Sequence, residues 1–359
     1  MRWYQAYTEL NRFITGNREI EIDSHVIAIP QQMRPEFYRL FDGVRTAFIE
    51  EEFPRLLDES RRLSESYTKV EEEVIDLLRL DDVSMAPGLH RFLREPKNQL
   101  IRGLFDLLFD VLKGKREVEA FGQEASRSIE ESFKGLYQSG YEKWVALSLV
   151  RLLEPHKTFH IPLRQPTSKE IIKRLPTSRE PVPLPEESDR LSFNHETMPI
   201  LIVPDFIVYS ARVDTYIAVR SEFENAMWTA ANISREREWH TFDAISGRNG
   251  PLDLKPSLIL WVADHPEDLA LIADSRRVLK PDLIVECMVQ KNWYEENGLE
   301  NVKLRHDVLR PKFGTYVVTR EPVPEQVREE LGAHIHLLTG GFDRSKLGSI
   351  SDILGNHRS

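Results

Sequence analysis

Strand-forming residues dominate the stretch PDFIVYSARVDTYIAVRSEFE, which spans residues 204–224. Residues 206–209 and 216–223 are rich in β-branched and aromatic side chains, which favour extended backbone. Between these runs, the segment 212–214 is short enough to turn the chain back on itself. The stretch therefore predicts a β-hairpin.

After the hairpin, the expected pattern alternates between helices and short strands. A helix is expected over residues 225–241. The strands are expected at four nearly wholly apolar runs: 257–263, 282–289, 314–319 and 334–338. Apolar runs separated by helices are typical of a parallel sheet covered on both faces. Because the hairpin adds an antiparallel pair, the sequence predicts an α/β domain with a mixed sheet over residues 194–359.

Residues 1–154 are expected to form a helical domain. Between Leu56 and Leu77 the apolar residues recur at spacings of seven, four and three, which places them on one face of a long helix. The segment 99–113 is apolar nearly all round, so it is expected at the buried centre. A third helix is expected over residues 126–153. The fold class is therefore a helical half followed by an α/β domain.

A proline-rich segment, residues 155–193, separates the two patterns and is expected to be a linker. Within residues 151–180, seven Lys or Arg stand against three Asp or Glu. This balance favours contact with phosphate through Lys169, Lys173 and Arg174. A solvated linker with no binding role is the alternative.

Composition limits the classes of protein to which this chain can belong. A chain of 359 residues is long enough for two domains, and its net charge of −10 argues against indiscriminate binding of polyanions. The single cysteine, Cys287, rules out an intramolecular disulfide and a thiolate zinc cluster, and it fits a reducing compartment. No signal peptide is recognisable, and no apolar run approaches the roughly 20 residues of a membrane span. We therefore expect a soluble, cytoplasmic protein.

Three charged residues are expected to share one face of the second hairpin strand. Arg220, Glu222 and Glu224 alternate with less polar neighbours, so their side chains point to the same side. Asp205 opens the partner strand and could converge with both glutamates. Convergent carboxylates are suitable ligands for Mg²⁺, which bridges water and phosphate in many phosphodiester hydrolases. The alternative is that these carboxylates form structural salt bridges.

Pro204-Asp205, followed by a hairpin, a helix and the buried strand at 258–263, resembles the PD-(D/E)XK nuclease superfamily, which has the restriction-endonuclease-like fold. The resemblance covers roughly residues 194–340. It implies that acidic residues hold the metal and that a lysine two positions after the second acid orients the attacking water.

The chain departs from this family at the lysine position. Glu222-Phe223-Glu224 matches a minority form in which a glutamate replaces the lysine. If Val219 or Arg220 instead occupies the acidic position, the hydrolytic site is lost.

A second Pro-Asp pair precedes another acidic strand residue. Asp282 opens an apolar run that contains Glu286, with a methionine in the place of the lysine. These two carboxylates form an alternative metal site. The structural alternative is that Glu286 is buried and satisfied by a basic neighbour.

The first hypothesis is a Mg²⁺-dependent nuclease of the restriction or defence type. Asp205 and Glu222 would hold the ion, Glu224 would help hold it or position the water, and Arg220 would steady a phosphate. The helical half would recognise nucleic acid or form a homodimer.

Two rival hypotheses remain. One is a non-catalytic interaction protein with a decayed nuclease-like domain. The other is an unrelated α/β ligand-binding domain whose site lies at the carboxyl ends of parallel strands, near Asp264, His265 and Glu286.

Overall fold

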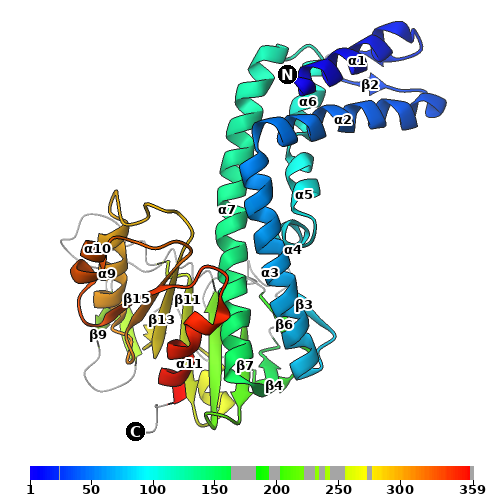
Figure 1. Ribbon diagram of the computed structural model, residues 1–359. Coiled ribbons are helices and arrows are strands. Elements are labelled where there is room, and N and C mark those ends of the chain that lie inside the picture. Colours follow the sequence, from blue (N-terminus) through cyan, green and yellow to red (C-terminus); the bar gives the residue numbers. More distant parts are fainter. Residues whose placement is uncertain are drawn as a thin grey trace. The chain divides into compact units, whose positions relative to one another are not determined.

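A helical N-terminal half is followed by a large mixed β-sheet, which confirms the coarse architecture expected from the sequence (Figure 1). The chain divides into two compact units, Met1–Thr68 with Pro87–Gly140 and Lys69–Ala86 with Tyr141–Ser359. The structure is a computed structural model that describes these residues: 1–23, 25–162, 183–193, 203–221, 231–233, 239–242, 255–272 and 277–355.

Aromatic side chains form the centre of the first unit. Trp3 lies edge-on to Phe48, with ring centroids 5.4 Å apart, and Phe41 lies 4.6 Å from Phe109. The expected central segment 99–113 is split between two short helices. The helices of the chain's N-terminal half are α1 (Arg2–Gly16), α2 (Arg34–Glu52), α3 (Pro54–Leu78), α4 (Pro87–Arg94), α5 (Pro96–Gly103), α6 (Phe105–Leu112) and α7 (Val118–Leu153).

The second unit is built on an eight-stranded sheet with the order β15-β14-β13-β11-β8-β7-β4-β5. Strands β13, β14 and β15 are mutually parallel, and every other neighbouring pair is antiparallel. The strands are β4 (Pro155–His160), β5 (Glu186–Glu187), β7 (Phe206–Ser210), β8 (Thr215–Ser221), β11 (Leu258–Ala263), β13 (Leu283–Met288), β14 (Thr315–Thr319) and β15 (Ile335–Thr339). The predicted hairpin is therefore β7–β8.

Smaller pairings complete the described strands. They are β1 (Glu21–Ile22) with β2 (Ile27–Ala28), β3 (Asp82–Ser84) with β6 (Arg190–Ser192), and β10 (Trp239–Phe242) between β9 (Ala231–Ile233) and β12 (Arg277–Leu279). Strands β9 and β10 fall within the helix expected over residues 225–241, so that prediction is wrong for these residues. Their β-branched and aromatic side chains suit a strand, and pairing with the distant β12 decides the outcome.

The stretch expected to be a linker, 155–193, contributes strands β4 and β5 to the large sheet. Pro155 occupies the first position of β4, where a missing N–H is tolerated. Residues 163–182, which include Lys169, Lys173 and Arg174, lie outside the described residues.

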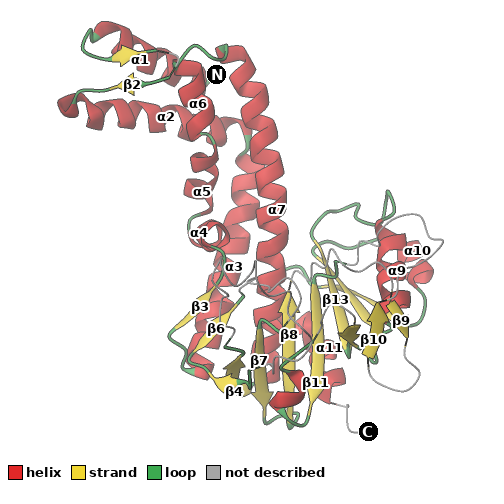
Figure 2. Cartoon of the chain, turned by 180° about the vertical axis from the view of Figure 1, so that it is seen from behind, coloured by secondary structure: helices red, strands yellow, loops and turns green. Residues whose placement is uncertain are grey.

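Helices cover both faces of the sheet (Figure 2). On one face, Lys143 of α7 reaches Ser221 of β8. On the opposite face, Leu309 of α9 (Gly298–Leu309) belongs to the same buried cluster as Ala218 and Trp261. The odd-numbered side chains of β8 therefore point toward α7, and the even-numbered ones point toward the α9 side.

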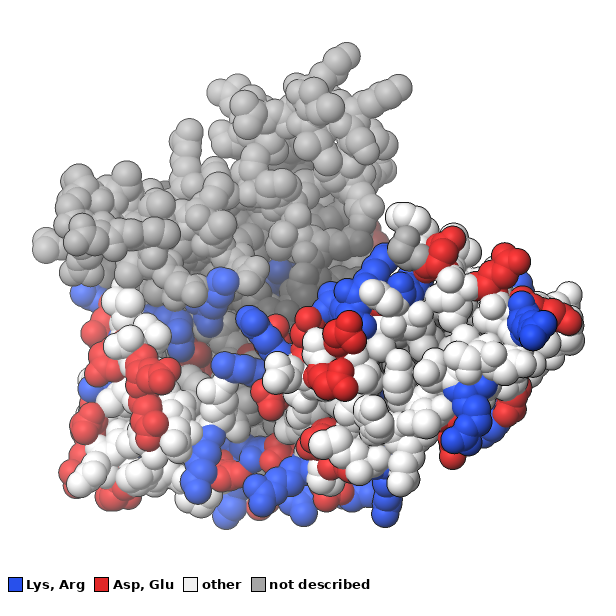
Figure 3. Space-filling model, turned by 90° about the horizontal axis from the view of Figure 1, so that it is seen from above, with Lys and Arg blue, Asp and Glu red and all other residues white. Residues whose placement is uncertain are grey.

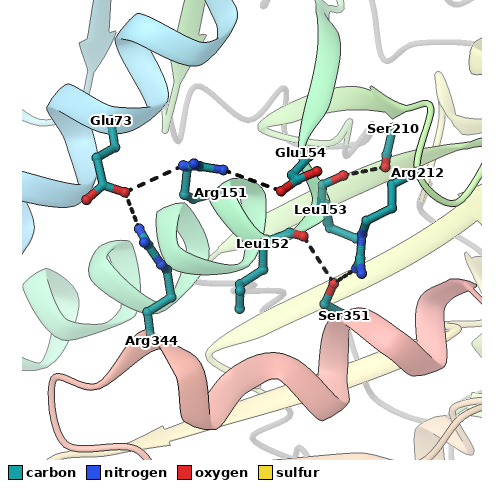
Figure 4. A network of polar contacts seen from close by, with 9 residues as sticks. All are labelled: Glu73, Arg151, Leu152, Leu153, Glu154, Ser210, Arg212, Arg344 and Ser351. Carbon is teal, nitrogen blue, oxygen red and sulfur yellow. Dashed lines mark hydrogen bonds and ion pairs between the residues drawn. The ribbon is translucent and has the colours of Figure 1, made fainter.

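A polar network anchors the last turn of α7 within the second unit (Figure 4). Glu73 of α3 accepts from Arg344 and lies 3.5 Å from Nε of Arg151 on α7. Ser351 donates to the carbonyl of Leu152 at 3.4 Å. The remaining helical segments are η1 (Gln31–Met33), η2 (Pro266–Leu269), α10 (Glu325–Leu331), η3 (Arg344–Leu347) and α11 (Gly348–Gly355).

Candidate functional site

Asp205 lies at the start of β7, beside the carboxyl end of β8. Its backbone N–H donates to the carbonyl oxygen of Val219 at 2.8 Å, and Phe206 is paired with Val219 in the hairpin register. The tight hairpin fixes this register, because the two strands are joined by only four turn residues, 211–214. Asp205 is thereby held next to Arg220 and Ser221, the last two residues of β8.

Both carboxylate oxygens of Asp205 have partners from β8. Arg220 Nη1 donates to Oδ1 at 2.9 Å, while the backbone N and the Oγ of Ser221 donate to Oδ2 at 2.8 and 2.7 Å. The side chain of Asp205 is 0% exposed and that of Arg220 is 4% exposed. This is a fully desolvated ion pair whose carboxylate is also hydrogen-bonded, the arrangement that a buried charge needs.

Helix α7 adds a second cation to the cluster. Lys143 is fully buried, and its Nζ donates to Ser221 Oγ at 2.9 Å. The same ammonium group lies 5.1 Å from the ring centroid of Phe193. Ser221 thus accepts from Lys143 and donates to Asp205, which links both buried cations to one carboxylate. We refer to Lys143, Asp205, Arg220 and Ser221 as the Asp205 cluster.

Lys143 and Ser221 were not identified from the sequence. A signal for the lysine was present, because Glu142-Lys143 interrupts an otherwise apolar part of a helix that ends in VALSLVRLL. A charge pair within such a run indicates that a buried partner is available elsewhere in the fold.

The donors around Asp205 do not fit a Mg²⁺ site. Mg²⁺ requires near-octahedral oxygen coordination and usually keeps several waters. Here, the guanidinium of Arg220 occupies one carboxylate oxygen, Ser221 occupies the other, and no surface of the carboxylate reaches solvent. Within the described ranges, no group of three His, Cys, Asp or Glu side chains is arranged to hold a metal ion.

Glu222 and Glu224 lie outside the described residues, which stop at Ser221 in this part of the chain. Of the four hairpin residues predicted to form the site, the structure describes Asp205 and Arg220 and brings them into direct contact. It joins them as an ion pair.

The alternative pair, Asp282 and Glu286, does not converge. Asp282 Oδ2 accepts from the backbone N of Val262 at 2.8 Å, at the start of β13. Glu286 is four residues further along the strand, about 13 Å away in extended backbone. The two carboxylates therefore cannot share one ion.

Glu286 forms a buried ion pair with Arg305 of α9, on the face of the sheet opposite α7. Burial raises the pKa of Glu286, and the charge and hydrogen bond of Arg305 oppose that rise. The neighbouring Cys287 is also buried, and its pKa is raised well above its ordinary value by burial first and then by the carboxylates of Glu142 and Glu286. A basic partner for Glu286 is what the structural alternative predicted.

The proposed ligand site near Asp264, His265 and Glu286 is not assembled, so that prediction is wrong. Strand β11 runs antiparallel to β13, with Leu258 opposite Val285. The carboxyl end of β11, which precedes Asp264, therefore lies at the opposite end of the sheet from Glu286. The sequence could not show that β11 and β13 are antiparallel, because an apolar strand has the same composition whichever way it runs in the sheet.

Positive and negative side chains are mixed on the described part of the surface in Figure 3. On the face in Figure 3, the Lys and Arg side chains are interspersed with Asp and Glu side chains. The described surface in that view offers no broad field of one sign.

Comparison with known proteins identified no relative: no protein-family model, curated protein or solved structure matches the chain. Among the described residues, no helix combines the length and the apolarity needed to cross a membrane. The Asp205 cluster is therefore the feature of the molecule that bears on its function.

Proposed function

We propose that this chain is a non-catalytic interaction protein whose α/β unit is a nuclease-like domain without a hydrolytic metal site. The observation that carries the proposal is the contact between Arg220 Nη1 and Asp205 Oδ1 at 2.9 Å, with both side chains withdrawn from water. In the register in which Arg220 occupies the acidic position of the PD-(D/E)XK pattern, the hydrolytic site is lost. The contact of Arg220 with Asp205 supports that register, because its fixed positive charge lies where a metal cation would be needed.

The partner that we propose is nucleic acid. The support for it is the excess of Lys and Arg over residues 151–180, in a chain that is otherwise acidic. Replacing Lys169, Lys173 and Arg174 with alanine is expected to weaken binding and to flatten its dependence on salt, since fewer counterions are released. Filter binding or fluorescence anisotropy across a salt series measures both quantities. The matched control is alanine at Arg61, Lys97 and Arg127, which are exposed and lie outside the basic segment.

An active Mg²⁺-dependent nuclease is the second candidate. It is favoured by the hairpin register, because Asp205 is bonded to Ser221, the residue immediately before Glu222. In that case the ion pair would have to open so that Asp205 and Glu222 could bind the ion, with Glu224 near the attacking water.

A cleavage assay separates the two candidates. The full chain is incubated with single- and double-stranded DNA and with RNA, in Mg²⁺ or Mn²⁺ and in chelator. We expect binding without divalent-dependent cleavage. Cleavage that requires the metal and is lost in both Asp205→Asn and Glu222→Gln would overturn the proposal and establish the nuclease. An absence of both binding and cleavage would overturn the choice of nucleic acid as the partner.

A further inference from the structure

The two outer strands of the eight-stranded sheet differ sharply in their protection. Strand β5 has only two residues, Glu186 and Glu187, and both are exposed. Pro183 and Pro185 precede it, and Glu187 forms an ion pair with Lys157 at 2.8 Å. Short length, charge and proline are the usual features that prevent a sheet edge from pairing with another strand.

Strand β15 has none of these features. Its five residues, Ile335-His-Leu-Leu-Thr339, include no proline and no Asp, Glu, Lys or Arg. It is the last strand in the order of the sheet, and in the part of the chain that the structure describes it pairs on one side only, with β14. An edge of this kind is open to strand addition.

The hydrogen bonds to β14 identify which backbone groups face the open side. Thr315 N donates to the carbonyl of His334 at 3.1 Å, and Gly340 N donates to the carbonyl of Thr319 at 3.0 Å. In a parallel pair, alternate residues bond to the neighbour, so the even-numbered residues of β15 face β14. The N–H and C=O groups of Ile335, Leu337 and Thr339 consequently point away from the sheet.

A shallow hollow of ≈ 410 Å³ runs against the same strand. Residues 335–338 line it together with Arg328 and Gly332, at the end of α10, and Ser349 of α11. The hollow therefore opens beside the strand, between residues of α10 and α11. His336 and Thr339 are exposed, whereas Ile335 and Leu337 are buried in the cluster beneath α10.

We propose that two copies of this chain associate through β15, with the strands antiparallel and centred on Leu337. In that register Ile335 pairs with Thr339 of the second copy, and Leu337 pairs with its own equivalent. Each of the three outward-facing residues then donates one hydrogen bond and accepts one, so no outward group is left over. The strand is thus complementary to itself, as a two-fold interface requires.

The side chains of β15 and the protected edge at β5 are both compatible with a closed dimer. Across the interface His336 stands opposite Leu338, so no like charges face each other. Because the far edge, β5, is guarded by glutamates and prolines, pairing stops at two copies and cannot propagate into a fibre. This surface is distinct from the helical half and independent of the proposed function.

The test compares Thr339→Pro with Thr339→Ala in the full chain. Proline at this exposed position removes an outward-facing N–H and leaves the bonds to β14 in place. Sedimentation velocity over a concentration series should show a dimer for the parent and for Thr339→Ala, and a monomer for Thr339→Pro. Circular dichroism and thermal melting confirm that both variants are folded.

A disulfide cross-link tests the register without depending on the proline variant. His336 and Leu338 of the second copy form a non-hydrogen-bonded pair with Cα atoms about 4.5 Å apart, which a disulfide can bridge. We expect His336→Cys/Leu338→Cys to form a covalent dimer on mild oxidation and His336→Cys alone to do so far less. Cys287 is buried and does not interfere. A parent chain that stays monomeric, or a dimer that persists in folded Thr339→Pro and does not cross-link, would overturn the proposal.

Discussion

Each of the two units buries an arginine, but the partners of the two arginines differ. In the α/β unit, Arg220 faces Asp205, and the exposed fractions of the two side chains are 4% and 0%. In the helical unit, the side chain of Arg45 is 8% exposed, while its partner Asp42 is 57% exposed. Arg45 also donates to the carbonyl of Ile101 at 3.1 Å and lies over the ring of Phe41.

This difference in exposure determines how much each carboxylate contributes to the free energy of unfolding. Water can solvate Asp42 whether or not Arg45 is present, so that pair resembles a surface salt bridge in its energetics. Asp205 has no access to water and depends wholly on its protein partners. Both oxygens of Asp205 already accept hydrogen bonds from protein donors.

The largest effect is expected when Arg220 is removed. Arg220→Met keeps much of the side-chain volume but removes the direct counter-ion of the buried Asp205 carboxylate, so the free energy of unfolding should fall by about 3–5 kcal/mol. Urea denaturation of the full chain measures the loss. The double variant with Asp205→Asn should lose less than the sum of the two single variants, because the pair is removed as a unit. Additive losses would mean that the two residues are not coupled.

A smaller effect is expected at Arg45. Arg45→Met should cost about 1–3 kcal/mol, chiefly because the buried carbonyl of Ile101 loses its donor. Asp42→Asn should change the free energy of unfolding by no more than about 1 kcal/mol, since the carboxylate is largely solvated. Equal losses at Asp42 and Asp205 would remove the distinction between the two pairs.

The smallest effect is expected from His306, whose titration makes the stability of the fold depend on pH. Its pKa is lowered below the ordinary value, first by burial and then by the nearby His334 and His336, while Asp307 opposes the shift. The unfolded state therefore binds the proton more readily than the folded state. Stability from this group is complete above pH about 6.5 and declines as the pH falls from there toward the folded pKa. His306→Gln should flatten that part of a plot of melting temperature against pH, and an unchanged slope would contradict the assignment.

The sequence predicted the local features of the α/β unit because those features depend on neighbouring residues. The β7–β8 hairpin follows from two strand-forming runs joined by a short turn, and this register brings Asp205 to Arg220. The helix expected over residues 225–241 was wrong for the described part of that range, because strands β9 and β10 depend on pairing with residues 277–279.

The sequence could not predict the long-range part of the candidate site. Lys143 precedes Asp205 by 62 positions, and only the packing of α7 on the sheet brings it to Ser221. The hairpin pattern predicted that charged residues share a strand face, but it could not distinguish a metal site from an ion pair. That distinction depends on burial, which is a property of the whole unit.

The dependence of stability on Mg²⁺ shows whether Asp205 belongs to a structural ion pair or to a metal site. A ligand that binds only the folded state raises stability in proportion to the logarithm of its concentration. The melting temperature of the parent chain is measured over a Mg²⁺ series and a Mn²⁺ series, with KCl at matched ionic strength as the control. We predict that neither cation raises the melting temperature beyond the KCl control, and that Asp205→Asn melts well below the parent in every condition. A rise with Mg²⁺ in the parent that disappears in an equally stable Asp205→Asn would contradict the account.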